Sequence, residues 1–209
     1  MLDLVLPQQC GGCGAPATPW CADCARALAV RPDEPHLVTP RLDPGVPVFA
    51  LGRYNGPRRR AVVAVKEHGR ADLIGPLASA LRGGLRRLWE WGIVAPPLTV
   101  VPAPTRRWAA RRRGGDPVTR MAVAAAGDTP GFAVVPALRT RALVADSVGL
   151  STAGRQRNIA GRVRLIRPVA GDLLLVDDIV TTGATATESV RVLRAAGASV
   201  VAILTIAAA

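Results

Sequence analysis

The sequence is short of several residue types. Lys66 is the only lysine among 209 residues, so arginine supplies nearly all the positive charge behind a formal net charge of +12. Only seven residues are aromatic (four Trp, two Phe and one Tyr), which is few for a protein that binds single-stranded nucleic acid by stacking its bases. No apolar run approaches the ~20 residues that span a bilayer, so no membrane insertion is expected.

The start of the chain also lacks a targeting pattern. Met1–Leu4 have neither a basic beginning nor a long apolar core, so they do not resemble a secretory signal. We therefore expect a cytoplasmic protein, in which thiols stay reduced.

The positive charge is uneven along the chain. Residues 1–40 hold two arginines and four acids, so the excess lies in the remainder. A basic surface attracts phosphate esters or nucleic acid. Arginine that merely solubilises the surface would produce the same count, and on charge alone both interpretations stay open.

Three stretches differ in composition, and we expect three corresponding units. Residues 1–30 contain all four cysteines and predict a small four-cysteine module. Residues 31–47 contain five prolines and predict a linker or strapping loop. Residues 48–209 alternate apolar runs with helical patterns, which predicts an α/β fold with a mostly parallel sheet and helices on both faces.

The periodicity of the apolar residues indicates where the elements lie. Strands are expected at 46–54, 98–101, 132–135, 162–166, 173–176 and 200–206. Helices are expected at 57–67, 72–91, 118–126 and 185–196, with a helical turn at 151–157.

The most informative segment begins at Leu173. Four apolar residues predict a buried strand that ends at Val176, and Asp177 and Asp178 follow it. Open parallel sheets bind ligands at this end of their strands. A turn and a helix start come next, and their N–H groups and hydroxyls suit a phosphate. The residues of this turn are Thr181, Thr182, Gly183, Ala184 and Thr185.

The chemistry of this segment limits the class of ligand that it could bind. Thr185 and Glu188 match a capping box, which predicts that the helix begins at Thr185. The two acids repel phosphate but suit sugar hydroxyls or hydrated Mg²⁺, so ribose 5-phosphate meets both demands. Neither a Walker A loop nor a G-x-G-x-x-G loop follows the strand. The remaining alternative is an ordinary strand–turn–helix with solvated acids.

The cysteines form a second constellation, C-x2-C-x7-C-x2-C. Two such knuckles present four thiolates, enough for a closed tetrahedral Zn²⁺ site of the structural kind. About 30 residues bury too little surface to fold alone, so bound metal would supply the folding energy. Two disulfides are the alternative, which a reducing cytosol disfavours. The predicted ligands are Cys10, Cys13, Cys21 and Cys24.

The strand followed by Asp-Asp and Thr-Thr-Gly-x-Thr resembles the phosphoribosyltransferase signature. Together with the four-cysteine knuckle, it makes the chain look like the ComF family of bacterial competence proteins. Val65–Gly69, Val101–Pro104 and the Leu-Ser stretch from Leu150 resemble further motifs of that family. Two departures remove amide side chains. Gly115-Asp116-Pro117 stand where the family has Phe-Asn-Gln, and Asp146 stands where it has Gln.

The resemblance implies a site for phosphoribosyl diphosphate and Mg²⁺. Asp177 and Asp178 would face the ribose hydroxyls and magnesium, the turn 181–185 would hold the 5′-phosphate, and Pro102 and Ala103 would form a pyrophosphate loop. Arginine binds phosphate oxygens in pairs, so the segment Arg111, Arg112 and Arg113 would clamp pyrophosphate. A nucleic-acid patch and a solvated loop are alternatives for that segment. Lys66, as the only lysine, indicates a site that needs a compact cation.

A catalytic protein of this kind would transfer a 5-phosphoribosyl group and release pyrophosphate, but no residue identifies the acceptor. The resemblance also implies a role in DNA uptake during natural transformation, with a helicase-like partner. The alternatives are a non-catalytic uptake component that binds single-stranded DNA and a regulator that senses nucleotides.

Overall fold

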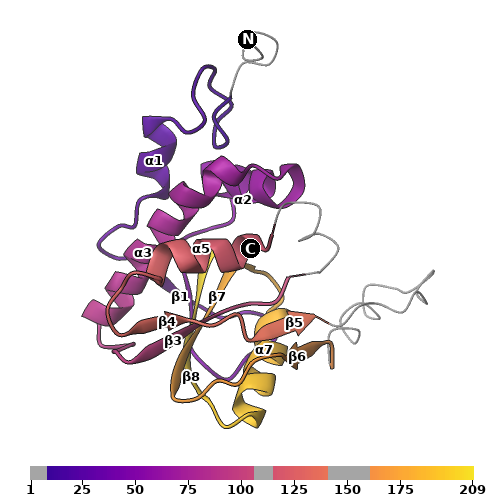
Figure 1. Cartoon of the computed structure of the whole chain (residues 1–209). Coiled ribbons are helices and arrows are strands. Elements are labelled where there is room, and N and C mark those ends of the chain that lie inside the picture. The colour runs from indigo at the N-terminus through magenta and orange to yellow at the C-terminus, as the bar shows by residue number, and fades with distance from the viewer. Residues whose placement is uncertain (1–8, 106–114, 141–160) are drawn as a thin grey trace, which may run out of the picture.

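The computed structural model describes residues 9–105, 115–140 and 161–209 (Figure 1). The helical turn expected at 151–157 lies outside them. Among the described helices, none combines the length and hydropathy needed to cross a membrane.

One six-stranded sheet forms the centre of the protein, with the strand order β1-β2-β8-β7-β3-β4. Only β1 and β2 pair antiparallel, and every other neighbouring pair is parallel. The mostly parallel sheet expected from the sequence is therefore confirmed. The strands are β1 (His36–Val38), β2 (Val48–Ala50), β3 (Leu98–Pro102), β4 (Phe132–Val134), β7 (Asp172–Val180) and β8 (Ser199–Ala208).

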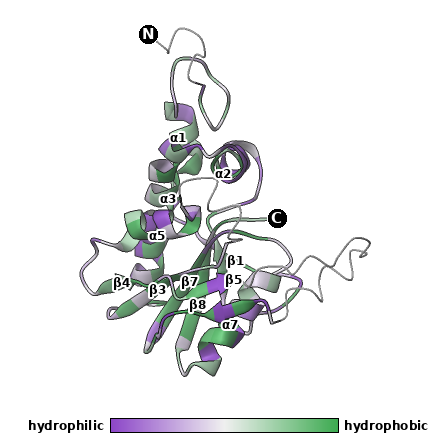
Figure 2. Ribbon diagram, turned by 45° about the vertical axis from the view of Figure 1, so that its right-hand side comes forward, coloured by the Kyte–Doolittle hydropathy of each residue, from purple (hydrophilic) through white to green (hydrophobic). Residues whose placement is uncertain are grey.

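Helices cover both faces of the sheet, as expected (Figure 1). One face carries α2 (Gly56–His68), the short helix η1 (Ala71–Leu73), α3 (Ile74–Glu90) and α5 (Pro117–Ala126). The other face carries α7 (Ala184–Ala195). Figure 2 shows that the central strands β7 and β8 are largely hydrophobic, which is typical of parallel strands buried on both faces.

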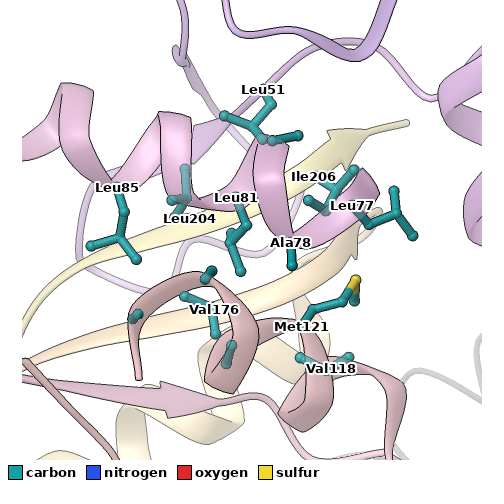
Figure 3. Close-up of a cluster of buried hydrophobic side chains, with 14 of the residues drawn as sticks. Leu51, Leu77, Ala78, Leu81, Leu85, Val118, Met121, Val176, Leu204 and Ile206 are labelled. Carbon is teal, nitrogen blue, oxygen red and sulfur yellow. The ribbon is translucent and has the colours of Figure 1, made fainter. Parts of the chain in front are cut away.

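The larger core lies between the sheet and the helices α3 and α5 (Figure 3). Leu77, Leu81 and Leu85 recur on one side of α3 and are buried, as three- and four-residue spacing predicts for an amphipathic helix. They pack toward Val176 of β7 and Leu204 of β8. A second cluster, between the sheet and α7, includes Leu175 and Ile203.

Two local expectations need correction. Strand β2 spans only Val48–Ala50 of the expected 46–54, because Gly52 at a φ of 155° breaks the extended run. The stretch expected as an edge strand at 162–166 is β6 (Val163–Leu165), and it pairs with β5 (Leu138–Thr140) in a separate two-stranded sheet. The Pro-rich segment 31–47, expected as a linker or strapping loop, also supplies β1 to the main sheet.

Candidate functional site

Strand β7 is longer than its apolar run indicated. It continues through Asp177 and Asp178 to Val180, because β8 goes on pairing with it as far as Ala208. Side chains alternate along a strand, so the two acids point to opposite faces of the sheet. Asp177 lies on the face toward α7, and Asp178 lies on the face toward α2.

The other neighbour of β7 turns away just before the acids. Pro102 of β3 pairs with Val176, and the Ala103 amide donates to the Val176 carbonyl at 2.7 Å. Both residues are buried in the sheet. Beyond this point β8 is the only described strand that accompanies β7, so β3 does not pair with the acid pair.

The turn after β7 depends on Gly183. This glycine has a φ of 82° and serves as the N-cap of α7, which begins at Ala184. A side chain here would be strained, and its Cβ would also collide with the Leu42 carbonyl. The predicted capping box is wrong: the helix begins one residue earlier than Thr185, and the Glu188 carboxylate instead accepts from the Gly161 amide at 2.8 Å.

A cavity of about 110 Å³ occupies the space between this turn and the sheet. Asp177 and Thr205 contribute to its wall, together with all five predicted turn residues, Thr181 to Thr185. The first amides of a helix have no intrahelical partner, so the amides of Thr185 and Ala186 at the start of α7 remain available to an anion. The structure therefore brings one predicted acid and the predicted turn to the same cavity.

Asp178 does not line that cavity. Its carboxylate is buried, and Oδ1 lies 2.8 Å from Nζ of Lys66 on α2. Burial is the largest influence and opposes ionisation of Lys66, but the charge and hydrogen bond of Asp178, together with the charge of Asp177, outweigh it and raise the pKa of the ammonium. The structure thus places the only lysine of the chain beside the acid pair, as a cation that remains charged.

The surroundings of Asp177 disfavour its ionised form. Burial and the neighbouring charge of Asp178 raise its pKa well above the usual value, and Lys66 compensates only in part. Its Oδ1 also accepts from the Asp178 amide at 2.8 Å. A cation or a hydrogen-bond donor placed in the cavity would stabilise this carboxylate in its ionised form.

The Pro-rich segment crosses over the turn. The Leu42 amide donates to the Thr182 carbonyl at 2.8 Å, and the Thr187 hydroxyl donates to the Leu42 carbonyl at 3.3 Å. Residues 39–45, called the strap here, therefore hold the turn in place from outside. The arginines predicted to clamp pyrophosphate, Arg111, Arg112 and Arg113, lie outside the described residues.

Sequence reasoning missed a second, larger cavity of about 670 Å³. It adjoins the first and shares Val180 and Thr181 with it. Arg41 of the strap and Arg53 of the connection from β2 to α2 both line it. The only signal in the sequence was a polar run, Arg53-Tyr54-Asn55, directly after a buried strand.

The four cysteines converge as their spacing predicted. The four Sγ atoms lie within 4.8 Å of one another, and those of Cys13 and Cys21 are 3.6 Å apart. Tetrahedral zinc at ~2.3 Å from each sulfur places sulfurs about 3.8 Å apart, so this cluster fits a closed structural Zn²⁺ site.

Backbone amides around the cluster favour thiolates. The amides of Cys21 and Gly12 approach Cys10 Sγ at 3.3 and 3.4 Å. Burial is the largest influence and opposes ionisation of Cys10, but these amides, together with the Cys13 amide and the Cys21 side chain, outweigh it and lower the pKa of the thiol to about 6. Burial raises the pKa of Cys24, so a positive ion would be needed to hold that sulfur as a thiolate.

The cysteine module, residues 9–28 with helix α1 (Ala22–Leu28), is docked on the rest of the chain. The Arg70 guanidinium donates to the carbonyls of Gln9 and Pro19 at 3.1 and 3.3 Å, and Arg60 donates to Gly12 at 3.2 Å. A Cβ on Gly11 would collide with Leu73. The module therefore rests on α2 and η1, and α2 is the helix that carries Lys66.

Comparison with known proteins adds no identification. No protein-family model matches the chain, and no curated protein matches it significantly. The chain thus contains a four-cysteine cluster followed by a mostly parallel α/β sheet with helices. The chemistry of the site is the basis for its function.

Proposed function

We propose that this chain binds phosphoribosyl diphosphate with Mg²⁺ and transfers its 5-phosphoribosyl group, as a ComF-type protein of the phosphoribosyltransferase fold. The observation that carries the proposal is the cavity with the turn Thr181–Thr185 on one side and Asp177 on its wall. Amides and hydroxyls bind a phosphate, and a carboxylate accepts from ribose hydroxyls. Both halves of a sugar phosphate therefore find partners in one cavity.

Each residue near the cavity has a chemical role in this proposal. The turn holds the 5′-phosphate, and Asp177 accepts from a ribose hydroxyl. Lys66 and Asp178 supply a fixed cation and anion beside Asp177. Pro102 and Ala103, at the end of β3 next to β7, are proposed to form the pyrophosphate loop. Arg111–Arg113 are proposed to approach the pyrophosphate.

The reaction itself is a substitution at C1 of the ribose. The acceptor's lone pair forms a bond to C1 while the bond from C1 to the pyrophosphate oxygen breaks, and that oxygen keeps the electron pair. An acceptor that carries a proton on the attacking atom then gives it to water. Bound Mg²⁺ would offset the charge of the leaving pyrophosphate.

The cysteine cluster has a structural role in the same proposal. Four thiolates close the coordination of Zn²⁺ and leave no open position for substrate. The module contacts α2 through Arg60 and the start of η1 through Arg70, so the metal would stabilise the helix that presents Lys66. A link to DNA uptake, with a helicase-like partner, is part of the proposal.

A second candidate is non-catalytic binding of single-stranded DNA. The formal net charge of +12 favours it. With only seven aromatic residues, such binding would rest on phosphate contacts and would weaken steeply with added salt.

Calorimetry with phosphoribosyl diphosphate and Mg²⁺ tests the proposal. The wild type should bind, and Asp177→Asn should bind about tenfold more weakly or worse, since a charged hydrogen-bond acceptor is lost. Asp172→Asn is the matched control, because it changes the same residue type at the exposed far end of β7. No binding by the wild type, or equal binding by both variants, would refute the site. Salt-sensitive DNA binding without pyrophosphate release would favour the second candidate.

A further inference from the structure

The larger cavity, of about 670 Å³, has a composition unlike that of the phosphate turn. It lies where the strap, the connection from β2 to α2 and the ends of β7 and β8 meet. Its volume is in the range of small-molecule sites and far exceeds the space that a pyrophosphate needs. The lining residues are Val38, Thr39, Pro40, Arg41, Arg53, Tyr54, Asn55, Val180, Thr181, Ala208 and Ala209.

Positive groups outnumber negative ones in the lining of this cavity. Arg41 and Arg53 come from two different segments and both are exposed, and none of the lining side chains is acidic. The one carboxylate of the lining is the terminal group of Ala209. Guanidinium groups pair with anionic oxygens, so the lining favours a negatively charged ligand.

The remaining lining residues favour a flat, partly apolar molecule. Tyr54 is half-buried, and Val38, Val180 and Ala208 add apolar surface. Asn55 precedes α2 as its N-cap residue, yet its side chain makes no capping hydrogen bond, so its amide is free to serve a ligand. Arg59 lies over the Tyr54 ring, 5.8 Å from its centroid, so a planar ligand would pack against the remaining surface of Tyr54 and the apolar residues. The Asn55 amide would then hydrogen-bond a polar edge of that ligand.

Main-chain hydrogen bonds fix the positions of these residues before any ligand binds. The Tyr54 amide donates to the Ala208 carbonyl at 2.7 Å, and Arg53 forms a parallel bridge with Ala208. Leu42, next to Arg41, donates to the Thr182 carbonyl at 2.8 Å. Pre-positioned groups lose little entropy on binding, so this lining is suited to recognition.

The two cavities share Val180 and Thr181, so their ligands would be neighbours. We infer that the larger cavity holds the acceptor of the transfer reaction, and that this acceptor is a planar nitrogen heterocycle bearing a carboxylate. The inference rests on the proposed function for the phosphate cavity. It adds the substrate class that the sequence left open.

Matched pairs of ligands test the charge requirement. Orotate and uracil, like nicotinate and nicotinamide, have similar rings and differ in the carboxylate. In calorimetry with the full chain, phosphoribosyl diphosphate and Mg²⁺, at least one carboxylate should bind about tenfold more tightly than its neutral partner. Arg41→Gln and Arg53→Gln should each abolish that preference. Arg86→Gln, on an exposed part of α3, should preserve it.

The outcomes distinguish failure of the acceptor assignment from failure of the phosphoribosyl diphosphate site. If phosphoribosyl diphosphate binds but neither carboxylate exceeds its neutral partner, or if the arginine variants keep the preference, the acceptor assignment is wrong and the phosphate site stands. If phosphoribosyl diphosphate does not bind, both fail. An oligothymidine that binds in an Arg53-dependent way, and that orotate does not displace, would also overturn the assignment. Thermal unfolding and binding of phosphoribosyl diphosphate by each variant check that Gln has not disturbed the fold.

Discussion

The ammonium of Lys66 lies 2.8 Å from a carboxylate oxygen of Asp178. The two residues are far apart in the chain, one on α2 and one on β7, and their contact links the helix that supports the cysteine module to the strand of the acid pair. Asp178 is buried and Lys66 is about one-third exposed, so the acid depends on the lysine more than the lysine depends on the acid.

Lys66→Met should lower the free energy of unfolding by about 1–3 kcal/mol, because it leaves the Asp178 carboxylate buried without its partner. Partial exposure of Lys66 keeps the loss below that of a fully buried pair. Urea denaturation measures the change. The double variant Lys66→Met/Asp178→Leu should recover part of the stability, and a single variant as stable as the wild type would contradict the pairing.

Asp177 should make the stability depend on pH. Its pKa is raised above the unfolded value, so its protonated form stabilises the fold at low pH, and that contribution is lost as pH rises through the folded pKa. Asn cannot ionise, so the stability of Asp177→Asn relative to the wild type should increase with pH above about 4. Urea unfolding at a series of pH values, without Mg²⁺, measures this difference.

The control for this measurement is Asp172→Asn, at the exposed start of β7, which should leave the pH profile unchanged. Added Mg²⁺ should stabilise the wild type at high pH more than it stabilises Asp177→Asn. Parallel profiles for Asp177→Asn and the wild type would show that this carboxyl is not perturbed.

The cysteine cluster should bind one Zn²⁺ per chain, and Gly12→Ala should weaken that binding. An added Cβ at residue 12 would lie 2.5 Å from Cys24 Sγ and 2.9 Å from the Trp20 ring, so the cluster must distort to admit it. Competition with a coloured chelator measures the affinity. Ala27→Ser, on an exposed position of α1 in the same module, should retain the wild-type value. Equal affinities for both variants would refute this packing.

Two glycines of α3 should respond in opposite ways to alanine. Gly75 has open space where a Cβ would lie, so Gly75→Ala should stabilise the protein by about 0.5–1 kcal/mol through helix propensity. At Gly84 the Cβ would lie 2.5 Å from a Leu51 methyl, and overpacking should destabilise by about 1–3 kcal/mol. Thermal or urea unfolding measures the stability of each variant relative to the wild type. A gain in stability for Gly84→Ala would contradict the close approach of α3 to the sheet.

Local patterns were enough to predict the elements that matter most for the site. The apolar run before Asp177 predicted a buried strand, the glycine after two threonines predicted a turn into a helix, and the cysteine spacing predicted a four-thiolate cluster. Each depends on interactions within a few residues. The exact start of α7 escaped prediction, because the conformation of Gly183 and the contact with Leu42 outweigh the capping signal of Thr185.

The sequence by itself determined the type and order of most elements, since side-chain periodicity and turn chemistry are encoded over short stretches. It did not predict α1, β1 and β5, which have seven, three and three residues and are too short to show a clear period. Only the tertiary structure decided which side chains meet. It placed Lys66 against Asp178, turned Asp177 toward a cavity that Asp178 does not share, and laid the strap over the turn. It also joined Arg41 and Arg53 in one cavity. Such pairings depend on how helices and strands pack across the sheet. Local sequence patterns do not show which residues far apart in the chain this packing brings together.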